Sequence, residues 1–504
     1  MDILKALNAH FKLSTFRTGQ REIITDLLKG RDVIAMLPTG AGKSICYQLP
    51  AFITPGVTIV VSPLLSLMED QVQQLKSKGL RKVIALNSFL SREEREIAYQ
   101  QLHMQKIIYV SPEILQSKYV MNKLKKLTVA YFVVDEAHCI SQWGHEFRTD
   151  YLKLSEARKQ LGNPPCLALT ATATEEVQQD IIEMLALTNY QTHVYSIDRP
   201  NIAMVVRSGS YTIEEKIADL VSLVQNLKGP GIIYASTRKW TEEITKILQN
   251  NGIKRISAYH GGMSNEDRIL IQQQFINDEL QLICCTSAFG MGVNKQNIRY
   301  VIHFHFPLQI ESYLQEIGRA GRDGEKSIAI TLYSEAESEL QLSLITREHP
   351  SIEQLNEVFR YLSHNSKEGT INENKLISET GITEIMWRFI RFHLEEQNIV
   401  IDNFCKLFSP EEGQVVIKMI NETITNRILY KKKKLVIFQK WLNNQEHCRR
   451  NAILKQFNET STSKNVYCCD VCGIELDSYF AKDNSHQENR FQSWQDELKS
   501  LFHI

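Results

Sequence analysis

Two adjacent carboxylates, Asp135 and Glu136, follow the apolar run YFVV. Buried parallel strands present residues at their carboxyl ends, where α/β proteins bind ligands. At such an edge Asp135 would hold Mg²⁺ through the coordination shell of the ion, while Glu136 would orient and deprotonate an attacking water. The alternative for this pair alone is a solvated acidic turn. A phosphate-binding segment elsewhere in the chain would favour the catalytic interpretation.

The segment LPTGAGKS, residues 37–44, is such a segment. It lies between the strand-like DVIAM and the helical ICYQLPAF, which is the context that a phosphate-binding loop requires. Its backbone N–H groups would converge on phosphate oxygens at a helix N-terminus. Lys43 would add a point charge, and the Ser44 hydroxyl would be a second Mg²⁺ ligand. The predicted nucleotide-binding residues of this loop are Thr39, Gly40, Ala41, Gly42, Lys43 and Ser44.

A pair of arginines, Arg319 and Arg322, lies in the Gly-rich stretch YLQEIGRAGRDG. Charge that develops on a transferred phosphoryl group is stabilised by guanidinium groups, which a neighbouring domain often supplies. By themselves, two arginines in such a stretch usually form a solvated turn. Because the chain also carries a phosphate loop, we expect both to reach the nucleotide.

The stretch SQWGHEFR, which follows the carboxylates, combines aromatic, amide and basic side chains. Stacking of a base on an aromatic ring contributes about 1–3 kcal/mol and tolerates any sequence. Aromatic residues more often belong to a core, but the polar neighbours here argue against burial. We therefore predict a nucleic-acid-binding loop that consists of Gln142, Trp143, His145, Phe147 and Arg148.

Length and periodicity place these motifs on several domains. A chain of 504 residues is too long for one core, and its 58 acidic and 58 basic residues create no global attraction to a polyanion. Strand-like runs alternate with helical segments from about residue 30 to residue 335, which predicts parallel sheets. The pattern restarts near residues 198–201, so we expect two α/β domains, 1–200 and 201–340.

The C-terminal third is predicted to be mostly helical. Residues 341–415 read as helices followed by a hairpin that turns at Asp402-Asn403, the order of a winged helix. Phe404 beside this turn is either a core residue or an aromatic that parts a duplex. A long helical module, 416–475, and a polar tail, 476–504, follow. The run KKKK within the module is either a solvated face or a phosphate-contacting surface.

Four of the ten cysteines gather near the C-terminus: Cys448, Cys468, Cys469 and Cys472. The N-terminus has no signal-peptide pattern, and no apolar run is long enough to span a bilayer. In such a chain a cysteine cluster predicts a structural Zn²⁺ site sooner than disulfides. Adjacent ligands on one ion are awkward, so a distorted site and a set of free thiols are the alternatives.

Ten motifs in register resemble the superfamily 2 helicases and, more closely, the RecQ family of ATP-dependent DNA helicases in its short bacterial form. The resemblance covers roughly residues 5–340 and recurs weakly at CRRNAILKQF. The motifs are FRTGQ, LPTGAGKS, SPLLSLMEDQV, VSPE, DEAHCISQWGHEFR, LTATAT, DRPNI, YHGGM, AFGMGVNK and QEIGRAGRDG.

This resemblance implies two RecA-like lobes, with ATP in the cleft and single-stranded DNA across both tops. Gln20 and Arg17 would read the adenine, and Gln315 would join the catalytic residues. Thr170 and Thr172 would link the nucleotide to the DNA path. The remaining implied positions are three on the DNA path, Ser236, Thr237 and Arg238, and two in a mobile loop, Gly290 and Gly292.

The chain departs from the family pattern at several positions. Leu13 replaces a frequent Tyr, which weakens adenine stacking, and Asn294 replaces an Asp near the cleft. In the metal module Val466 occupies the place of the expected second cysteine. The winged-helix-like segment precedes this module, whereas it usually follows it.

The resemblance implies a helicase that unwinds duplex DNA from 3′ to 5′ in repair and recombination, with ATP, Mg²⁺ and Zn²⁺ as cofactors. The expected partners are single-stranded and tailed duplex DNA, single-strand-binding protein and other repair factors, in the cytoplasm with the nucleoid. One alternative is a DNA-stimulated ATPase that translocates or remodels without separating strands. Another is an ATP-gated DNA clamp, and an RNA substrate is a lesser alternative.

Overall fold

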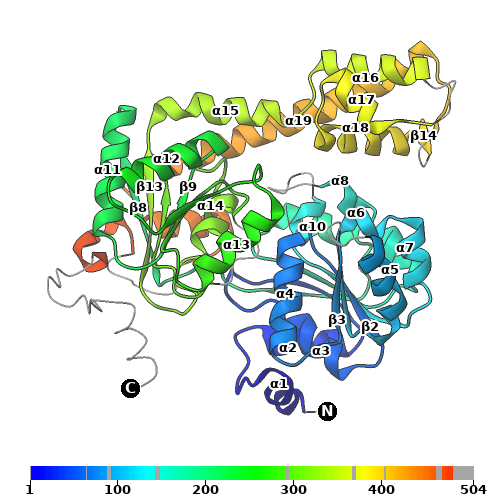
Figure 1. The fold of residues 1–504 in the computed structure, drawn as a ribbon, viewed down its shortest axis with the longest axis horizontal. Coiled ribbons are helices and arrows are strands. Elements are labelled where there is room, and N and C mark those ends of the chain that lie inside the picture. Colours follow the sequence, from blue (N-terminus) through cyan, green and yellow to red (C-terminus); the bar gives the residue numbers. More distant parts are fainter. Residues whose placement is uncertain are drawn as a thin grey trace.

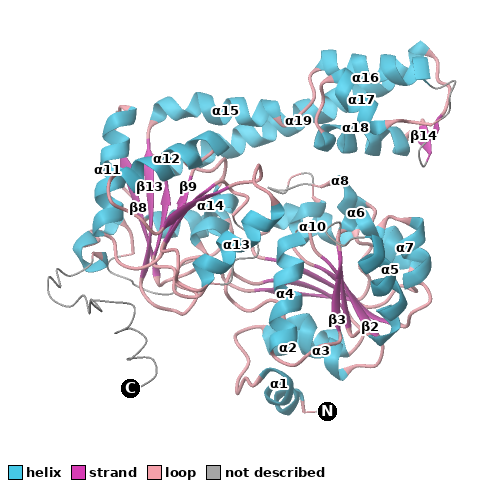
Figure 2. Cartoon of the chain, in the orientation of Figure 1, coloured by secondary structure: helices cyan, strands magenta, loops and turns pink. Residues whose placement is uncertain are grey.

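The computed structural model describes residues 2–63, 65–87, 92–141, 143, 148–209, 211–289, 295–365, 370–401, 404–460 and 468–480. They form two α/β lobes, a helical cluster and a Cys-rich module (Figure 1). Both sheets are enclosed by helices (Figure 2). Among the described helices, none is both long and apolar enough to cross a membrane.

Lobe 1 contains a parallel sheet of seven strands in the order β3-β4-β2-β5-β6-β1-β7. Strands β1, β2, β4 and β6 are buried along their whole length, as expected for a parallel sheet covered on both faces. The strands are β1 (Asp32–Met36), β2 (Val57–Val61), β3 (Val83–Leu86), β4 (Ile107–Val110), β5 (Val129–Val134), β6 (Cys166–Thr170) and β7 (Tyr190–Val194). The helices are α1 (Ile3–Phe11), α2 (Gln20–Leu28), α3 (Ile45–Ile53), α4 (Leu65–Ser77), α5 (Arg92–Gln101), α6 (Pro112–Leu115), α7 (Lys118–Leu124), α8 (Thr149–Leu152), α9 (Leu154–Gln160) and α10 (Glu175–Met184).

Lobe 2 contains a parallel sheet of six strands in the order β10-β11-β9-β12-β13-β8. The strands are β8 (Ile202–Ser208), β9 (Gly231–Tyr234), β10 (Ile256–Tyr259), β11 (Leu282–Cys285), β12 (Tyr300–His303) and β13 (Ser327–Tyr333). The helices are α11 (Ile213–Asn226), α12 (Arg238–Asn250), α13 (Asn265–Ile276) and α14 (Ile310–Ile317). Residues 195–201, here called the linker, join β7 of the first sheet to β8 of the second.

The C-terminal region is built on one long helix, α19 (Pro410–Leu442). It begins with a capping box between Ser409 and Glu412, and it crosses the expected boundary at residue 415. Figure 1 shows it running from the helical cluster to lobe 2. The other elements are α15 (Ser338–Arg347), α16 (Ile352–Asn365), α17 (Glu373–Thr380), α18 (Glu384–Glu396), the hairpin β14 (Val400–Ile401) and β15 (Phe404–Cys405), and α20 (Arg449–Gln456).

Aromatic packing fixes the far end of α19 on lobe 2. Phe438 contacts Phe306 and Tyr313, with ring centroids 6.3 and 5.6 Å apart, and Trp441 also contacts Tyr313. Two lysines of the KKKK run add ion pairs to this interface: Lys431 pairs with Glu348, and Lys434 Nζ lies 2.6 Å from Glu311. Half of this run is therefore engaged within the protein.

The helical cluster, α16–α18 with its hairpin, contacts lobe 1 through polar side chains. Arg388 of α18 lies 3.3 Å from Glu113 and 3.9 Å from Asp150, and Lys153 pairs with Glu395. The hairpin pairs Ile401 with Phe404, and the predicted turn at Asp402-Asn403 lies outside the described residues. The two parallel sheets, the helical C-terminal region and the cysteine cluster confirm the predicted fold class.

Candidate active site and nucleic-acid interface

The phosphate loop lies between β1 and α3, as the sequence predicts. Gly40 and Gly42 have φ angles of +90° and +79°, which glycine adopts without strain. Ser44 directly precedes α3, so Lys43 and Ser44 lie at a helix N-terminus. The partial positive charge of that terminus and the convergent N–H groups favour an anion such as phosphate.

The two carboxylates follow β5 at the same edge of the sheet. Glu136 has a φ angle of +48°, which is rare for a residue with a side chain and marks local strain. Its Oε1 lies 3.8 Å from Lys43 Nζ. Burial and the adjacent Glu136 raise the pKa of Asp135 to about 7. A divalent cation beside Asp135 would oppose this shift and hold the carboxylate ionised.

Both lobes line one cavity of about 460 Å³. From lobe 1 it receives Arg17, Gln20, Thr39, Gly40, Gly42, Lys43, Ser44, Asp135 and Glu136, and from lobe 2 Gln315, Arg319 and Arg322. Glu136 Oε2 is buried and accepts no hydrogen bond within the described residues. The hydroxyl and carboxylate oxygens suit Mg²⁺, a hard cation, and Lys43 suits a phosphate. The residues present therefore fit ATP with Mg²⁺.

The arginine turn, residues 318–322, approaches the phosphate loop closely. A Cβ built on Gly318 would lie 3.0 Å from the Thr39 Cβ, and one built on Gly40 would lie 3.3 Å from Arg322 Cγ. Burial, with the charges of Arg319 and Arg199, lowers the pKa of Arg322 to about 9. An anionic phosphate beside Arg322 would offset this repulsion and stabilise the charged guanidinium, as expected for an arginine that binds a charged ligand.

Arg17 and Gln20 bind the phosphate loop itself. Arg17 Nη1 donates to the Gly40 carbonyl at 2.5 Å, and Gln20 Nε2 donates to the carbonyls of Ala41 and Gly42 at 3.1 and 3.0 Å. The resemblance predicts that these side chains read adenine. In this structure their donors are directed to the loop, and both line the cavity.

Sequence reasoning overlooked a polar chain behind Glu136. His138 Nδ1 lies 3.5 Å from Glu136 Oε2 and 2.9 Å from Thr170 Oγ1. Thr170 Oγ1 in turn donates to the Thr172 carbonyl at 3.1 Å. The signal was present in the sequence, because His138 stands two positions after Glu136. His138 is hydrogen-bonded to Thr170 and lies close to Glu136, so these contacts place the carboxylate near the LTATAT segment.

Arg199 of the linker is a second overlooked residue, and it joins the two lobes. Its guanidinium donates to the Thr39 carbonyl of the phosphate loop at 2.8 Å. It also donates to three carbonyls of the arginine turn, those of Gly318, Ala320 and Gly321, at 3.0, 2.9 and 2.7 Å. The only sequence signal was its place in the segment DRPNI.

The aromatic loop is only partly described. Gln142, His145 and Phe147, like Gly290, Gly292 and Asn294, lie outside the described residues. Trp143 is half-buried against the core, and its ring lies 4.9 Å from that of Tyr430 on α19. Arg148 Nη1 donates to the Pro63 carbonyl at 2.9 Å and lies 3.9 Å from Glu113. Trp143 is thus more buried than its polar neighbours predicted.

On lobe 2, Ser236, Thr237 and Arg238 lie where β9 leads into α12. Thr237 caps this helix, because its Oγ1 accepts a hydrogen bond from the Trp240 N–H at 3.2 Å. The Ser236 N–H donates to His305 Nδ1 at 3.3 Å. Arg238 is exposed beside Gly262. A helix N-terminus with an exposed arginine can bind a phosphodiester.

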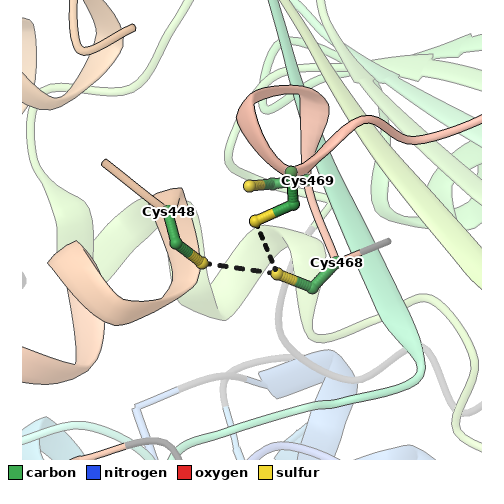
Figure 3. A group of neighbouring side chains, drawn as sticks. Cys448, Cys468 and Cys469 are labelled. Carbon is green, nitrogen blue, oxygen red and sulfur yellow. Dashed lines mark hydrogen bonds between the residues drawn. The ribbon is translucent and has the colours of Figure 1, made fainter. Parts of the chain in front are cut away.

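The four clustered cysteines converge. Their sulfur atoms all lie within 4.8 Å of one another, and the Sγ atoms of Cys448 and Cys468 are 3.4 Å apart (Figure 3). Burial alone would raise the pKa of Cys448, but N–H groups at the start of α20 and the neighbouring thiols lower it. Four convergent thiols fit a tetrahedral Zn²⁺, despite the adjacency of Cys468 and Cys469.

Comparisons with known proteins agree with this geometry. Three family models match the chain: DEAD/DEAH box helicase over residues 17–181, helicase conserved C-terminal domain over 215–324, and RecQ zinc-binding over 413–473. The probable ATP-dependent DNA helicase RecS of Bacillus subtilis is 43% identical over 502 residues, which cover 99% of this chain and 98% of that protein.

A second relative matches the motor region alone. The ATP-dependent DNA helicase RecQ of Haemophilus influenzae is 41% identical over 339 residues, which cover 66% of this chain and 54% of that protein. Among solved structures, the Mycobacterium smegmatis helicase Lhr bound to single-stranded DNA and AMP-PNP has a TM-score of 0.56 at 16% identity. That match covers 83% of this chain and 62% of that one, and it shows a shared fold.

Proposed function

The chain belongs to the RecQ family of ATP-dependent DNA helicases, and from this premise we propose that it unwinds duplex DNA from 3′ to 5′ in repair and recombination. One observation carries the proposal: the interlobe cavity unites Lys43, Asp135 and Glu136 of lobe 1 with Arg319 and Arg322 of lobe 2. Only closure of the two lobes assembles this set, which makes hydrolysis dependent on their relative position.

Each residue has a separate task in the proposed reaction. Lys43 and the loop N–H groups hold the terminal phosphates, and Glu136 takes a proton from the attacking water. Arg319 and Arg322 stabilise the charge that develops on the transferred phosphoryl group. Ser44 and Asp135 would hold Mg²⁺, which would supply positive charge to neutralise the phosphates.

The proposed DNA path crosses both lobes. The aromatic loop around Trp143 would stack bases, and the segment Ser236 to Arg238 would hold phosphates. The chain from Glu136 through His138 to Thr170 gives the hydrolytic site a physical connection toward that path. We assign the motor to residues 1–200 and 201–340, duplex engagement to 341–415 and metal binding to 416–475.

Unwinding can be tested with matched DNA substrates. Duplexes with a 3′ tail or a 5′ tail of equal length are incubated with ATP and Mg²⁺, and hydrolysis and strand displacement are measured in parallel. We expect displacement of the 3′-tailed duplex alone, and none with Glu136→Gln. Displacement of the 5′-tailed duplex would overturn the direction.

The same assays separate the alternatives. DNA-stimulated hydrolysis without displacement from either duplex would identify a translocase or remodeller. ATP-dependent DNA binding with no stimulated hydrolysis would identify a clamp. Stimulation by single-stranded RNA but not by DNA of the same sequence would assign an RNA substrate.

A further inference from the structure

The linker contacts both the Cys module, residues 448–460 and 468–480, and the ATP cleft. Toward the module, Ser196 Oγ donates to Glu459 Oε2 at 2.5 Å, and the Ile197 N–H donates to Glu459 Oε1 at 3.1 Å. The module also holds β8, the strand that follows the linker. There the backbone N–H of Met204 donates to the Cys468 carbonyl at 3.1 Å.

Arg450 of α20 makes the central contact of this set. Its guanidinium pairs with Asp198 and donates to the carbonyls of Arg199 and Ile202 at 2.9 and 2.5 Å. The Arg450 side chain is only 2% exposed. A buried guanidinium with three oxygen partners fixes the path of the backbone that it holds, because its donors have a rigid planar geometry.

The Arg199 side chain lies between the phosphate loop and the arginine turn, in a pocket beside the ATP cleft. There it bridges the phosphate loop and the arginine turn through four carbonyl oxygens. Asn201 adds hydrogen bonds to the carbonyls of Gly321 and Glu325 at 2.8 and 2.9 Å. The linker therefore contacts the Cys module through its backbone and through the side chains of Ser196 and Asp198. The Arg199 side chain contacts both parts of the ATP site.

We propose that Arg450 is a positioning residue for the ATP site. It fixes the linker so that Arg199 joins the phosphate loop to the arginine turn, and the Cys module thereby sets the closure of the cleft. A linker without secondary structure samples many orientations unless it is held. This proposal rests on the proposed function only in that the cleft binds ATP, and it holds whether or not strands are separated.

The first test compares single and double variants in basal hydrolysis, without DNA. We expect Arg199→Gln to raise the KM for ATP about tenfold, because the shorter amide loses the charge and cannot reach all four carbonyl oxygens. Arg450→Gln and Asp198→Asn should raise it in the same direction, and Arg450→Lys should restore part of the loss. If Arg450 acts through Arg199, the double variant Arg199→Gln/Arg450→Gln has the KM of Arg199→Gln alone. Lys455→Gln, an exposed position on α20, is the matched control.

A second measurement does not depend on hydrolysis. Amide hydrogen exchange of residues 195–206 should accelerate in Arg450→Gln and Asp198→Asn, and the affinity for mant-ADP should fall with it. Zinc content and Tm identify any variant that has lost the module itself, and Asp198→Asn leaves every cysteine and Arg450 in place. A KM and an exchange rate unchanged in Asp198→Asn, or independent effects in the double variant, would overturn the proposal.

The two proposals fail in different ways. If the unaltered chain hydrolyses ATP but separates no strands, the proposed unwinding is wrong, and the comparison of KM values still tests the role of Arg450. If the chain unwinds DNA and the linker variants behave as the unaltered chain does, only the role of Arg450 is wrong.

Discussion

The indole ring of Trp143 lies against the phenol ring of Tyr430, with centroids 4.9 Å apart and planes tilted by 53°. Trp143 follows the DEAH carboxylates of lobe 1, whereas Tyr430 belongs to α19 of the C-terminal region. The side chain predicted to stack on DNA is thus already in contact with an aromatic residue of another domain. A base that stacks on the same face of Trp143 would have to displace Tyr430.

Substitutions at Trp143 and Tyr430 test whether Tyr430 competes with DNA for the Trp143 ring or holds that ring in place. We expect Trp143→Ala to leave basal ATPase largely intact and to abolish stimulation by single-stranded DNA. Tyr430→Ala should lower the oligonucleotide concentration for half-maximal stimulation about twofold to tenfold, the range of an aromatic pair energy. Titration of oligo-dT in an ATPase assay measures both. If Tyr430→Ala also loses stimulation, Tyr430 supports the ring instead of competing for it.

Glu136→Gln should separate ATP binding from hydrolysis. The amide keeps the size of the side chain but cannot take a proton, so kcat should fall by about 10²–10⁴-fold, the range of general-base catalysis. Lys43 and the phosphate loop remain, so the affinity for mant-ATP should change little. Glu156→Gln, exposed on α9, is the control. An equal fall in affinity and kcat would mean that Glu136 mainly holds the nucleotide.

The sheets were largely predictable, because their strands are short apolar runs followed by motif residues. β7 is not predictable in this way, since it is an edge strand whose sequence YQTHV has only one aliphatic residue and alternates between exposed and half-buried positions. β3 has the apolar run VIAL, but no motif residues follow it, so the sequence does not mark it as a strand of the sheet. Its pairing with β4 is a tertiary contact that periodicity does not reveal.

The catalytic residues were predictable from local spacing, whereas the contacts between domains were not. Lys43 and Glu136 belong to short motifs whose chemistry follows from residue type. The Arg199 contact with Thr39 joins positions 160 residues apart, and the Arg450 contact with Asp198 joins positions 252 apart. The sequence around Arg199 and around Arg450 does not differ from that of an arginine on a solvated surface. Their roles arise from burial and from the fold that brings the linker to the Cys module.

The cysteine cluster predicts a bound Zn²⁺ ion. Substitution of a single cysteine of the cluster should therefore remove the metal. Cys448→Ser and Cys472→Ser should each lose Zn²⁺, and Tm should fall by about 5 °C or more, because binding of a structural metal contributes directly to folding. Metal content by mass spectrometry and thermal unfolding measure both effects. Cys405→Ala, a buried cysteine of the hairpin, is the control. Full metal content in both serine variants would leave the cluster as free thiols.

The lowered pKa of buried His305 predicts that the folded protein loses stability in mild acid. Burial and the nearby Lys216 lower the pKa of His305 to about 3, and its Nδ1 accepts the Ser236 N–H. Between about pH 6.5 and 3 the unfolded chain binds this proton and the folded chain does not, so stability falls as pH falls, by at most about 1.4 kcal/mol per pH unit. Half-buried His349, whose pKa is also lowered to about 3 by desolvation and by Arg427 and Lys431, acts in the same direction.

Thermal unfolding between pH 7 and 5 tests this dependence. Asp135 affects stability in the opposite direction, because its raised pKa makes the folded chain bind a proton before the unfolded chain does as pH falls. A variant is therefore compared with the unaltered chain at each pH. His305→Asn keeps an acceptor for Ser236 and removes the titration, so its Tm should fall less steeply. His364→Asn, at an exposed position, should leave the slope unchanged. Equal slopes in all three would contradict the assignment.

Phe404 is the residue at the hairpin that would meet a duplex. Its side chain is 58% exposed and pairs across the hairpin with Ile401, which is 45% exposed, so the alternative of a core residue is wrong. An exposed aromatic beside a turn can stack on the terminal base pair and stabilise its opening. Phe404→Ala should therefore slow strand displacement severalfold while DNA-stimulated ATPase stays unchanged.

The control for Phe404 must keep the hairpin and change another apolar side chain. Leu407→Ala removes a side chain that is 77% exposed three residues further along, and we expect no effect on displacement. Phe404→Trp should retain unwinding, because stacking needs a flat ring and not a particular one. If Phe404→Ala and Leu407→Ala slow displacement equally, the hairpin contributes general apolar contact to the DNA. If neither changes the rate, strand separation occurs between the two lobes without the hairpin.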